Sequence, residues 1–204
     1  MTFRTFNTLV AALLLSACST GKDVSSPLGQ VSISPPFADA FSCSQHWEGQ
    51  LPYKGDALGS DCYITGLVET PDGGGFYSAH TGDGLSNEDW FSWQQPVLAG
   101  FDGTVVRLSL NEVTNSPGHL GEPPASMIVL EREDGVHLLY AHIADPRVAE
   151  GDAVTAGQQI AIVGNNGFAR NPHIHLGAWK DKTPLAIVID LGAYGEVMGG
   201  DQSD

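Results

Sequence analysis

The stretch NPHIHLGAW, residues 171–179, places His173 and His175 one residue apart in a segment that predicts a β-strand. Successive side chains of a strand point to opposite faces, so these two rings share a face and can converge on one point. Imidazole is a common zinc ligand and also carries protons near neutral pH. The alternative is a pair of partly buried histidines bonded to backbone, so a second group of residues is needed to choose between the two interpretations.

The composition limits the classes of protein to consider. A chain of 204 residues is long enough for one domain with a substantial core. It has 9 Lys and Arg against 24 Asp and Glu, a net charge of -15, with no visible basic cluster, which excludes nucleic acid as a partner. The 25 glycines and 12 prolines predict many turns and a mainly β chain.

Short β-branched and aromatic runs, bounded by turn residues, follow one another from about residue 62 and predict a compact antiparallel β-sheet domain. An Asp134-Gly135 pair between two such runs predicts a hairpin. The segment PLAIVIDLGAY, residues 184–194, is expected to close the sheet or add a final strand. The runs before it are CYITGLVET, GGFYSAH, PVLAGFDGTVVRLSLNEV, SMIVLERED, GVHLLYAHI, QQIAIVGN and HIHLGAW.

The N-terminus has the shape of a secretory signal. Arg4 precedes an apolar run from Leu9 to Leu15, which is too short for a permanent membrane span, and small residues follow up to Cys18. The ending Leu-Ser-Ala-Cys resembles the lipobox of bacterial lipoproteins, in which cleavage precedes the cysteine and its thiol is lipidated. We therefore expect residues 1–18 to end at a lipidated Cys18, with the protein exported and anchored to a bacterial membrane. Ser19 resembles the pattern sorted to the outer membrane, facing the periplasm.

The organisation downstream follows from composition. Residues 19–40, rich in Ser, Pro and Gly, are expected to form a flexible tether, and residues 41–74 an N-terminal extension. Because export exposes the chain to an oxidising compartment, Cys43 and Cys62 are predicted to form a disulfide, which stabilises by about 3 kcal/mol. The acidic end, residues 196–204, is expected to be disordered.

Several separated motifs occur in a fixed order across residues 75–180. A histidine-glycine loop after His80 and a PVLAxxDGxVV strand come first, then YAH with His142, a GDxVxAGQxIxxVGNxG segment and the HIH motif. Together they resemble the lysostaphin-type (LytM) zinc metallopeptidases. The resemblance implies a domain over residues 75–195 with a compact antiparallel sheet related to the duplicated hybrid motif.

The resemblance also implies one zinc ion and assigns roles to the histidines. His80 matches the first metal ligand and His175, the second histidine of HIH, the last. His173 and His142 match the two catalytic histidines. Three protein ligands leave an open position at which zinc activates water and polarises a peptide carbonyl.

The carboxylate ligand departs from the family pattern. His-x-Gly-x-Asp demands an aspartate at position 84, where Gly84 stands. Asp83 lies one residue early, whereas counting back from the PVLA strand leads to Asp89, which is followed by an apolar residue as in the family. Only one of Asp83 and Asp89 is expected to bind the metal, and the sequence leaves the choice open.

Other residues in or near the matched motifs have less specific roles. His46 and His119 are expected to be surface or loop histidines, and His137 a side chain on a strand face. The aromatic cluster Trp90, Phe91 and Trp93 is interpreted either as a hydrophobic plug under the loop or as a wall of a substrate groove.

The function implied by the resemblance is a zinc metalloendopeptidase that hydrolyses peptide bonds of bacterial peptidoglycan, in the stem peptide or the cross-bridge. The partners would be peptidoglycan and, through the lipid on Cys18, a membrane. The alternative is a non-catalytic domain of the same type that binds cell wall or activates another wall hydrolase, with that hydrolase or a divisome protein as its partner. The displaced carboxylate favours this alternative, and the four motif histidines favour the enzyme.

Overall fold

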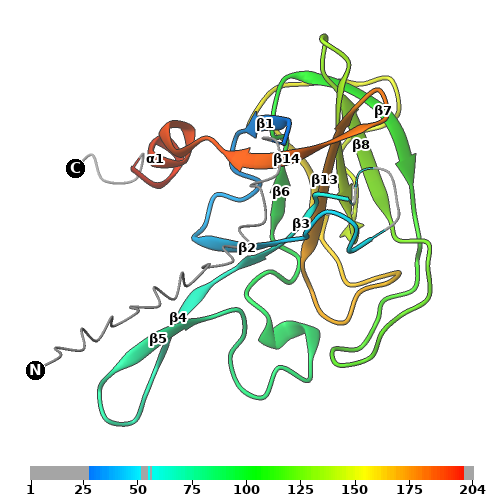
Figure 1. Ribbon diagram of the computed structural model, residues 1–204. Helices are drawn as coiled ribbons and strands as arrows, with labels where there is room; N and C mark the ends of the chain where they lie inside the picture. Colours follow the sequence, from blue (N-terminus) through cyan, green and yellow to red (C-terminus); the bar gives the residue numbers. More distant parts are fainter. Residues whose placement is uncertain (1–27, 52–54, 56, 200–204) are drawn as a thin grey trace, which may run out of the picture.

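The computed structural model describes residues 28–51, 55 and 57–199, so the predicted lipidation site Cys18 and residues 19–27 of the predicted tether lie outside it. Strands dominate these residues, as predicted (Figure 1). In chain order, the first strands are β1 (Gln30–Ile33), β2 (Phe41–Gln45), β3 (Ser60–Ile64), β4 (Gly66–Glu69), β5 (Gly75–Ser78), β6 (Pro96–Leu98) and β7 (Gly103–Ser109). They are followed by β8 (Met127–Glu131), β9 (Val136–Ala141), β10 (Ile143–Ala144), β11 (Ala153–Val154), β12 (Gln159–Val163), β13 (Ile174–Lys180) and β14 (Thr183–Ile189).

The largest sheet runs β1-β14-β13-β9-β8-β7-β11, and β3 joins it through β13 and carries β2 beside it. Its pairings are antiparallel except for β1, which lies parallel to β14. The predicted hairpin at Asp134-Gly135 is confirmed as the β8–β9 turn, where Gly135 adopts a φ of 82° and donates its backbone N–H to Arg132.

Strand β13, which contains His175 of the HIH motif, lies at the centre of this sheet. Its first half, Ile174–Leu176, pairs with β3 on one side, and β9 pairs along the other side from His175 onward. Its second half pairs with β14. Every residue of β13 except the last is buried, because the strand has neighbours on both edges and side chains packed on both faces.

A second sheet, β10-β12-β6, supplies the other half of the core. Ile143, Ile160 and Val97 of this sheet belong to the same buried cluster as Leu138 and Leu176 of the large sheet. This packing supports the strands that carry the site histidines. A separate two-stranded hairpin, β4–β5, projects from the end of β3 (Figure 1).

The described part of the predicted tether is not a tether. Residues 28–40 contain β1, and the side chains of Val31, Ile33 and Phe37 are buried in the core. Alternate residues of β1 are buried, which is the pattern of a strand. The high Ser and Pro content of this region obscured that pattern in the sequence. The segment expected to be an extension, residues 41–74, likewise contributes β2 and β3 to the large sheet.

The C-terminal end also differs from the expectation. The predicted last strand is confirmed as β14, but a helix, α1 (Leu191–Gly199), follows it through residues expected to be disordered. Asp190 accepts backbone N–H groups of Gly192 and Ala193 at its start, and Tyr194 packs edge-on against Phe41 of β2. Within the described part of the chain, no helix is long and apolar enough to cross a membrane.

Candidate metal centre

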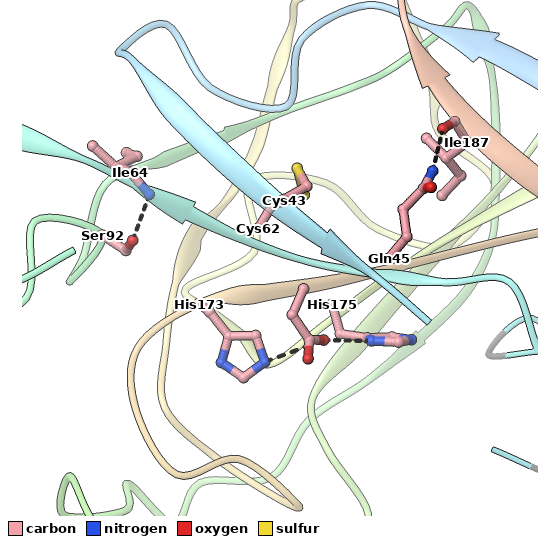
Figure 2. Close-up of a disulfide and its surroundings, with 9 residues drawn as sticks. Cys43, Gln45, Cys62, Ile64, Ser92, His173, His175 and Ile187 are labelled. Carbon is pink, nitrogen blue, oxygen red and sulfur yellow. Dashed lines mark hydrogen bonds and ion pairs between the residues drawn. A yellow bond between two sulfur atoms is a disulfide. The ribbon is translucent and has the colours of Figure 1, made fainter. Parts of the chain in front are cut away.

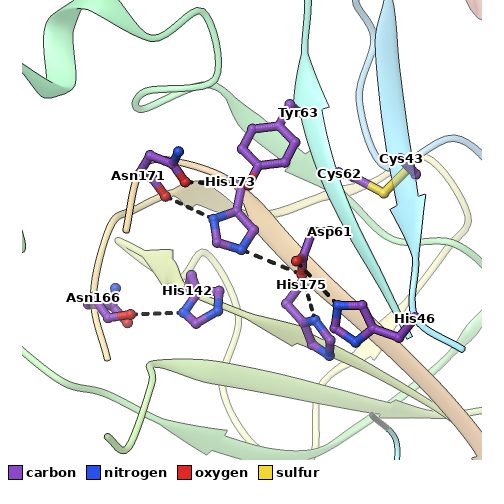
Figure 3. Close-up of polar contacts among 10 residues, drawn as sticks. All are labelled: Cys43, His46, Asp61, Cys62, Tyr63, His142, Asn166, Asn171, His173 and His175. Atoms are coloured by element: carbon purple, nitrogen blue, oxygen red, sulfur yellow. Dashed lines mark hydrogen bonds and ion pairs between the residues drawn. A yellow bond between two sulfur atoms is a disulfide. The ribbon is translucent and has the colours of Figure 1, made fainter. Parts of the chain in front are cut away.

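Three strands bring a His-Asp-His group to one face of the large sheet (Figure 3). Asp61 of β3 lies directly opposite His175 of β13 in the antiparallel register, so their side chains point to the same side. Ser44 of β2 lies opposite Asp61, and His46, two residues further along, reaches that same face. His46, Asp61 and His175 thus form a row across three adjacent strands.

The carboxylate of Asp61 is the centre of this group. Its Oδ1 lies 2.8 Å from His175 Nδ1 and 3.6 Å from His173 Nε2, and its Oδ2 lies 3.3 Å from His46 Nε2. Burial raises the pKa of Asp61, but the hydrogen bonds and charges of His173 and His175 outweigh burial and hold this pKa well below its ordinary value. The carboxylate is therefore ionised and can act as a metal ligand.

The group fits a zinc ion by its donors and its spacing. One donor atom from each of His46, Asp61 and His175 lies within 4.8 Å of the others. A tetrahedral zinc with bonds of about 2.0–2.2 Å keeps its ligand atoms about 3.4 Å apart, so a small contraction would suffice. The side chains of His46 and His175 are almost fully shielded, whereas that of Asp61 is 30% exposed, which leaves an approach from solvent.

Gly59 contacts both His46 and His175. It accepts a hydrogen bond from the backbone N–H of His46 at 2.8 Å, and it lies directly against the ring of His175. A Cβ at this position would come within 2.8 Å of His175 Cε1 and 2.7 Å of the Leu176 carbonyl oxygen. A glycine is therefore required for the backbone before β3 to approach the ring this closely.

His173 stands beside the group, just before β13 begins. Its Nδ1 donates to the carbonyl oxygen of Asn171 at 2.8 Å, which directs Nε2 toward Asp61. Its ring stacks on Tyr63 at 5.1 Å between centroids, and the Tyr63 hydroxyl donates to Asn171 Oδ1. Burial, then the charge of Asp61, raises the pKa of Tyr63 to about 12, so this hydroxyl keeps its proton.

His142 is the second flanking histidine, and its backbone is unusual. It joins β9 to β10 with a φ of 65°, the left-handed region that non-glycine residues seldom occupy outside functional sites. Its Nδ1 donates to the carbonyl oxygen of Asn166 at 2.8 Å, and its ring lies 4.7 Å from that of His173. Burial, and next the charge of His173, lowers the pKa of His142 to about 3, so the ring is neutral with an unprotonated Nε2.

The structure therefore brings together three of the predicted site residues, His142, His173 and His175. It places the other three elsewhere, in the loop of residues 79–95. His80 packs against Trp90 at 4.9 Å between centroids, and its Nδ1 contacts the carbonyl oxygen of the adjacent Thr81. The assignment of His80 as a ligand does not describe the group that the structure assembles, in which His46 holds the corresponding place.

The two candidate carboxylates are engaged within the same loop. Asp83 accepts the backbone N–H of Leu85 at 3.1 Å. Asp89 accepts that of Ser86 at 3.1 Å and so closes the short 3-10 helix η1 (Asn87–Asp89). These local hydrogen bonds hold both side chains within the loop, and neither belongs to the metal-ligating group found among the described residues. The carboxylate in that group is Asp61.

The structure also shows where the remaining histidines, the aromatic cluster and the two cysteines lie. His46, expected to be a surface or loop histidine, follows β2 in a loop but has a side chain only 9% exposed. His137 is a strand-face residue, as predicted, and stacks on Trp179. Phe91 packs against the core, as the plug interpretation requires. Trp90 lies 6.1 Å from Tyr63, so the loop also borders the site. The predicted disulfide between Cys43 and Cys62 is confirmed.

Comparisons with known proteins agree with this architecture. Residues 89–187 match the model of peptidase family M23. The chain therefore contains a peptidase M23 domain, and the resemblance to lysostaphin-type peptidases is confirmed.

Among curated relatives, a stretch of 83 residues is 36% identical to the DD-carboxypeptidase/endopeptidase Mpg of Neisseria meningitidis serogroup B. That match covers 41% of this chain and 19% of the meningococcal protein, so the chain spans about a fifth of the length of this relative. A metalloprotease of Haemophilus influenzae is 31% identical over 80 residues, which are 39% of this chain and 15% of that protein. The structure is also similar to the catalytic domain of the antimicrobial peptidase lysostaphin from Staphylococcus simulans, with a TM-score of 0.44 and 19% identity over 72% of this chain and 88% of that chain.

Proposed function

We propose that this protein is a zinc metalloendopeptidase that hydrolyses peptide bonds of bacterial peptidoglycan. The observation that carries the proposal is the convergence of His46, Asp61 and His175 from three paired strands, with two more histidines beside them. The peptidase family and the name of the meningococcal relative support the reaction class.

In the proposed mechanism, His46, Asp61 and His175 would hold one zinc ion. When bound, zinc supplies Lewis acidity, which polarises a peptide carbonyl and lowers the pKa of a water to about 7. The chain supplies the rest of the chemistry through His142 and His173.

His142 presents an unprotonated ring nitrogen to the site. Its Nδ1–H is committed to the Asn166 carbonyl oxygen, and its low pKa leaves Nε2 free of a proton at neutral pH. His173 is oriented in the same way by the Asn171 carbonyl oxygen, with Nε2 facing the Asp61 carboxylate. One ring can take the proton of the attacking water while the other donates to the oxygen or nitrogen of the scissile bond.

The activity is tested by the release of new amino groups from purified peptidoglycan. His142→Ala and His173→Ala are expected to keep zinc and to lose turnover by roughly 10²- to 10⁴-fold, the range for a positioned acid or base. Zinc content measured in parallel separates loss of chemistry from loss of metal. A zinc-loaded wild type that releases no more amino groups than the two variants, across several wall types, would contradict the peptidase proposal.

A second candidate function is a non-catalytic domain that binds cell wall or activates another wall hydrolase. It is favoured by the loop of residues 79–95, where the residues that the family resemblance assigned to the metal contact neighbouring loop residues instead. This candidate predicts that the chain stimulates a partner wall hydrolase while releasing no amino groups itself, so the same assay with and without that hydrolase distinguishes the two.

We also propose that the protein is exported and held at a bacterial membrane by a lipid on Cys18, with Ser19 favouring the outer membrane. A tethered hydrolase stays at a raised effective concentration near its polymer. Replacing Cys18 by serine should move the protein from the membrane fraction to the soluble fraction. Continued membrane association of that variant would contradict the anchor.

A further inference from the structure

The strand that delivers His46 is weakly held. Strand β2 pairs with β3 and with no other described strand, so one of its edges is open. After Phe41, its residues Ser42, Cys43, Ser44 and Gln45 are all exposed. Figure 2 shows Cys43 and Gln45 of this strand with their partners Cys62 and Ile187. A strand with little buried surface and one unpaired edge gains little from packing, so its position depends on a small number of specific ties.

The space beneath β2 is incompletely filled. A cavity of about 280 Å³ is lined by Cys43 and Gln45 of β2 together with Leu176 and Ile187 of the central strands. One side-chain hydrogen bond crosses to the central strands, from Gln45 Nε2 to the carbonyl oxygen of Ile187 at 3.2 Å. Beyond Phe41, which packs against the core at the start of the strand, side-chain packing therefore contributes little to holding β2 against the body of the sheet.

The Cys43–Cys62 disulfide is the covalent tie, and it lies next to the metal-ligand group. Cys43 and Cys62 face each other in the β2–β3 register, one position from the Ser44–Asp61 pair. Cys62 is fully buried in the core, whereas Cys43 is exposed, so the bond fastens the open strand to the core. His46 follows Cys43 by three residues.

We propose that the Cys43–Cys62 disulfide is a positioning element of the metal centre, which holds His46 beside Asp61 and so makes metal affinity depend on the oxidation state of these two cysteines. The proposal rests on the ligand group of the proposed function and adds a control on that group. It assigns the disulfide a role separate from general stabilisation, because the bond holds an edge strand that contributes a ligand and little of the core.

Cleavage of the disulfide requires a two-electron reductant. A trialkylphosphine attacks one sulfur and, with water, is oxidised to the phosphine oxide while the disulfide accepts two electrons and two protons and becomes two thiols. A phosphine is preferred to a dithiol as the probe because thiolates bind zinc themselves. A cellular dithiol would perform the same two-electron reduction by exchange.

The test uses the full chain carrying Cys18→Ser, so that Cys43 and Cys62 are its remaining cysteines. Zinc affinity is measured by competition with a chromophoric chelator before and after phosphine reduction, and the absorption bands of a Co²⁺-loaded sample are recorded for each state. Reduction is expected to weaken zinc binding roughly 10- to 100-fold, as loss of a contact that orients a ligand does. Circular dichroism should show the sheet intact.

Three variants separate positioning from stability. In the double variant Cys43→Ser, Cys62→Ser, the affinity should equal that of the reduced chain and should not respond to phosphine. In a His46→Ala background, reduction should change neither the affinity nor the Co²⁺ spectrum, because the ligand that the disulfide positions is already gone. Val129→Ala, a buried change in β8, serves as the matched control that lowers stability and leaves zinc affinity unchanged.

The outcomes are distinct. Equal zinc affinity of the oxidised and reduced chains would overturn this inference and leave the proposed peptidase standing. A further loss of affinity on reduction in the His46→Ala background, or collapse of the sheet on reduction, would show that the bond stabilises the domain generally, and would also overturn it. Failure of the oxidised chain to bind zinc would overturn both proposals.

Discussion

Two regions of this protein carry the residue types of a zinc site, and they differ in how their side chains are held. Near the start of β13, His175 lies in a central strand with β3 and β9 on its two sides, and its ring meets Asp61 across the sheet. In the loop of residues 79–95, by contrast, Asp83 and Asp89 bond to backbone groups two and three residues away.

The difference shows what a paired strand contributes to a site. The register of β13 with β3 sets which side chains oppose one another, so donors far apart in sequence meet at a fixed spacing. A loop offers its carboxylates nearer hydrogen-bond partners in its own turns, and those partners orient the side chains toward the loop instead of toward residues distant in the sequence. Residues of the right type and spacing in the sequence are therefore insufficient to define a ligand group.

The largest expected effect compares carboxylates from the two regions. Asp61→Asn keeps the shape of the side chain and removes the charge to which His46 and His175 turn, so it should weaken zinc binding by more than about 100-fold, beyond the range for outer contacts. Asp83→Asn and Asp89→Asn, its matched controls, should leave the affinity unchanged. Chelator competition on the purified chains measures all three. Loss of zinc in either control with retention in Asp61→Asn would transfer the site to the loop.

Replacing one histidine from each region should give a somewhat smaller difference in zinc affinity. His46→Ala should weaken zinc binding by about 100-fold, because Asp61 and His175 remain to hold the ion. His80→Ala removes a ring that packs on Trp90 and should bind zinc as the wild type does. Isothermal titration of both variants with zinc checks the prediction. The reverse ranking would restore His80 as the first ligand.

A separate effect, on folding and not on zinc binding, is the pH dependence of stability in the metal-free protein. The pKa of His142 is about 3 in the folded state, chiefly through burial, against 6.5 in the unfolded chain. Because the folded pKa is the lower one, the neutral ring contributes stability that is fully present above pH 6.5 and is lost as the pH falls toward 3. Across that window His142 should contribute a slope of up to about 1.4 kcal/mol per pH unit.

Urea unfolding at several pH values measures this slope. His142→Asn is a suitable variant, since asparagine tolerates the left-handed backbone at this position. The free energy of unfolding of the variant should fall less steeply between pH 6 and pH 4 than that of the wild type. Parallel slopes in the two proteins would show that His142 takes up a proton without leaving the fold.

The sequence predicted the central part of the molecule well, for physical reasons. The Asp134-Gly135 turn, the HIH strand and the final strand β14 are local patterns in which alternation and turn chemistry agree with the tertiary structure. His142, His173 and His175 were found because they lie within those strong local patterns and within the family motifs.

The two donors that the sequence analysis did not assign to the site are His46 and Asp61. They are brought together by long-range strand pairing, which local sequence patterns do not show. His46 and Asp61 meet because β2 and β3 form a ladder and β3 joins β13, more than 100 residues later in the chain. A usable signal was present in the predicted disulfide. If Cys43 opposes Cys62 in an antiparallel pair, residue 46 opposes residue 59, which places His46 next to Asp61 on the same face. Composition led to a wrong prediction for residues 28–40, which were expected to be a flexible tether. The buried alternate residues of β1 lie there among prolines and serines.

The most direct test of this account is the position of the metal itself. Crystals of the zinc-loaded chain, measured on both sides of the zinc absorption edge, would locate the ion by anomalous scattering. The account predicts a single peak within about 2.0–2.2 Å of donor atoms of His46, Asp61 and His175, with His142 and His173 nearby and not coordinating. A peak bound by His80 with Asp83 or Asp89 would contradict it.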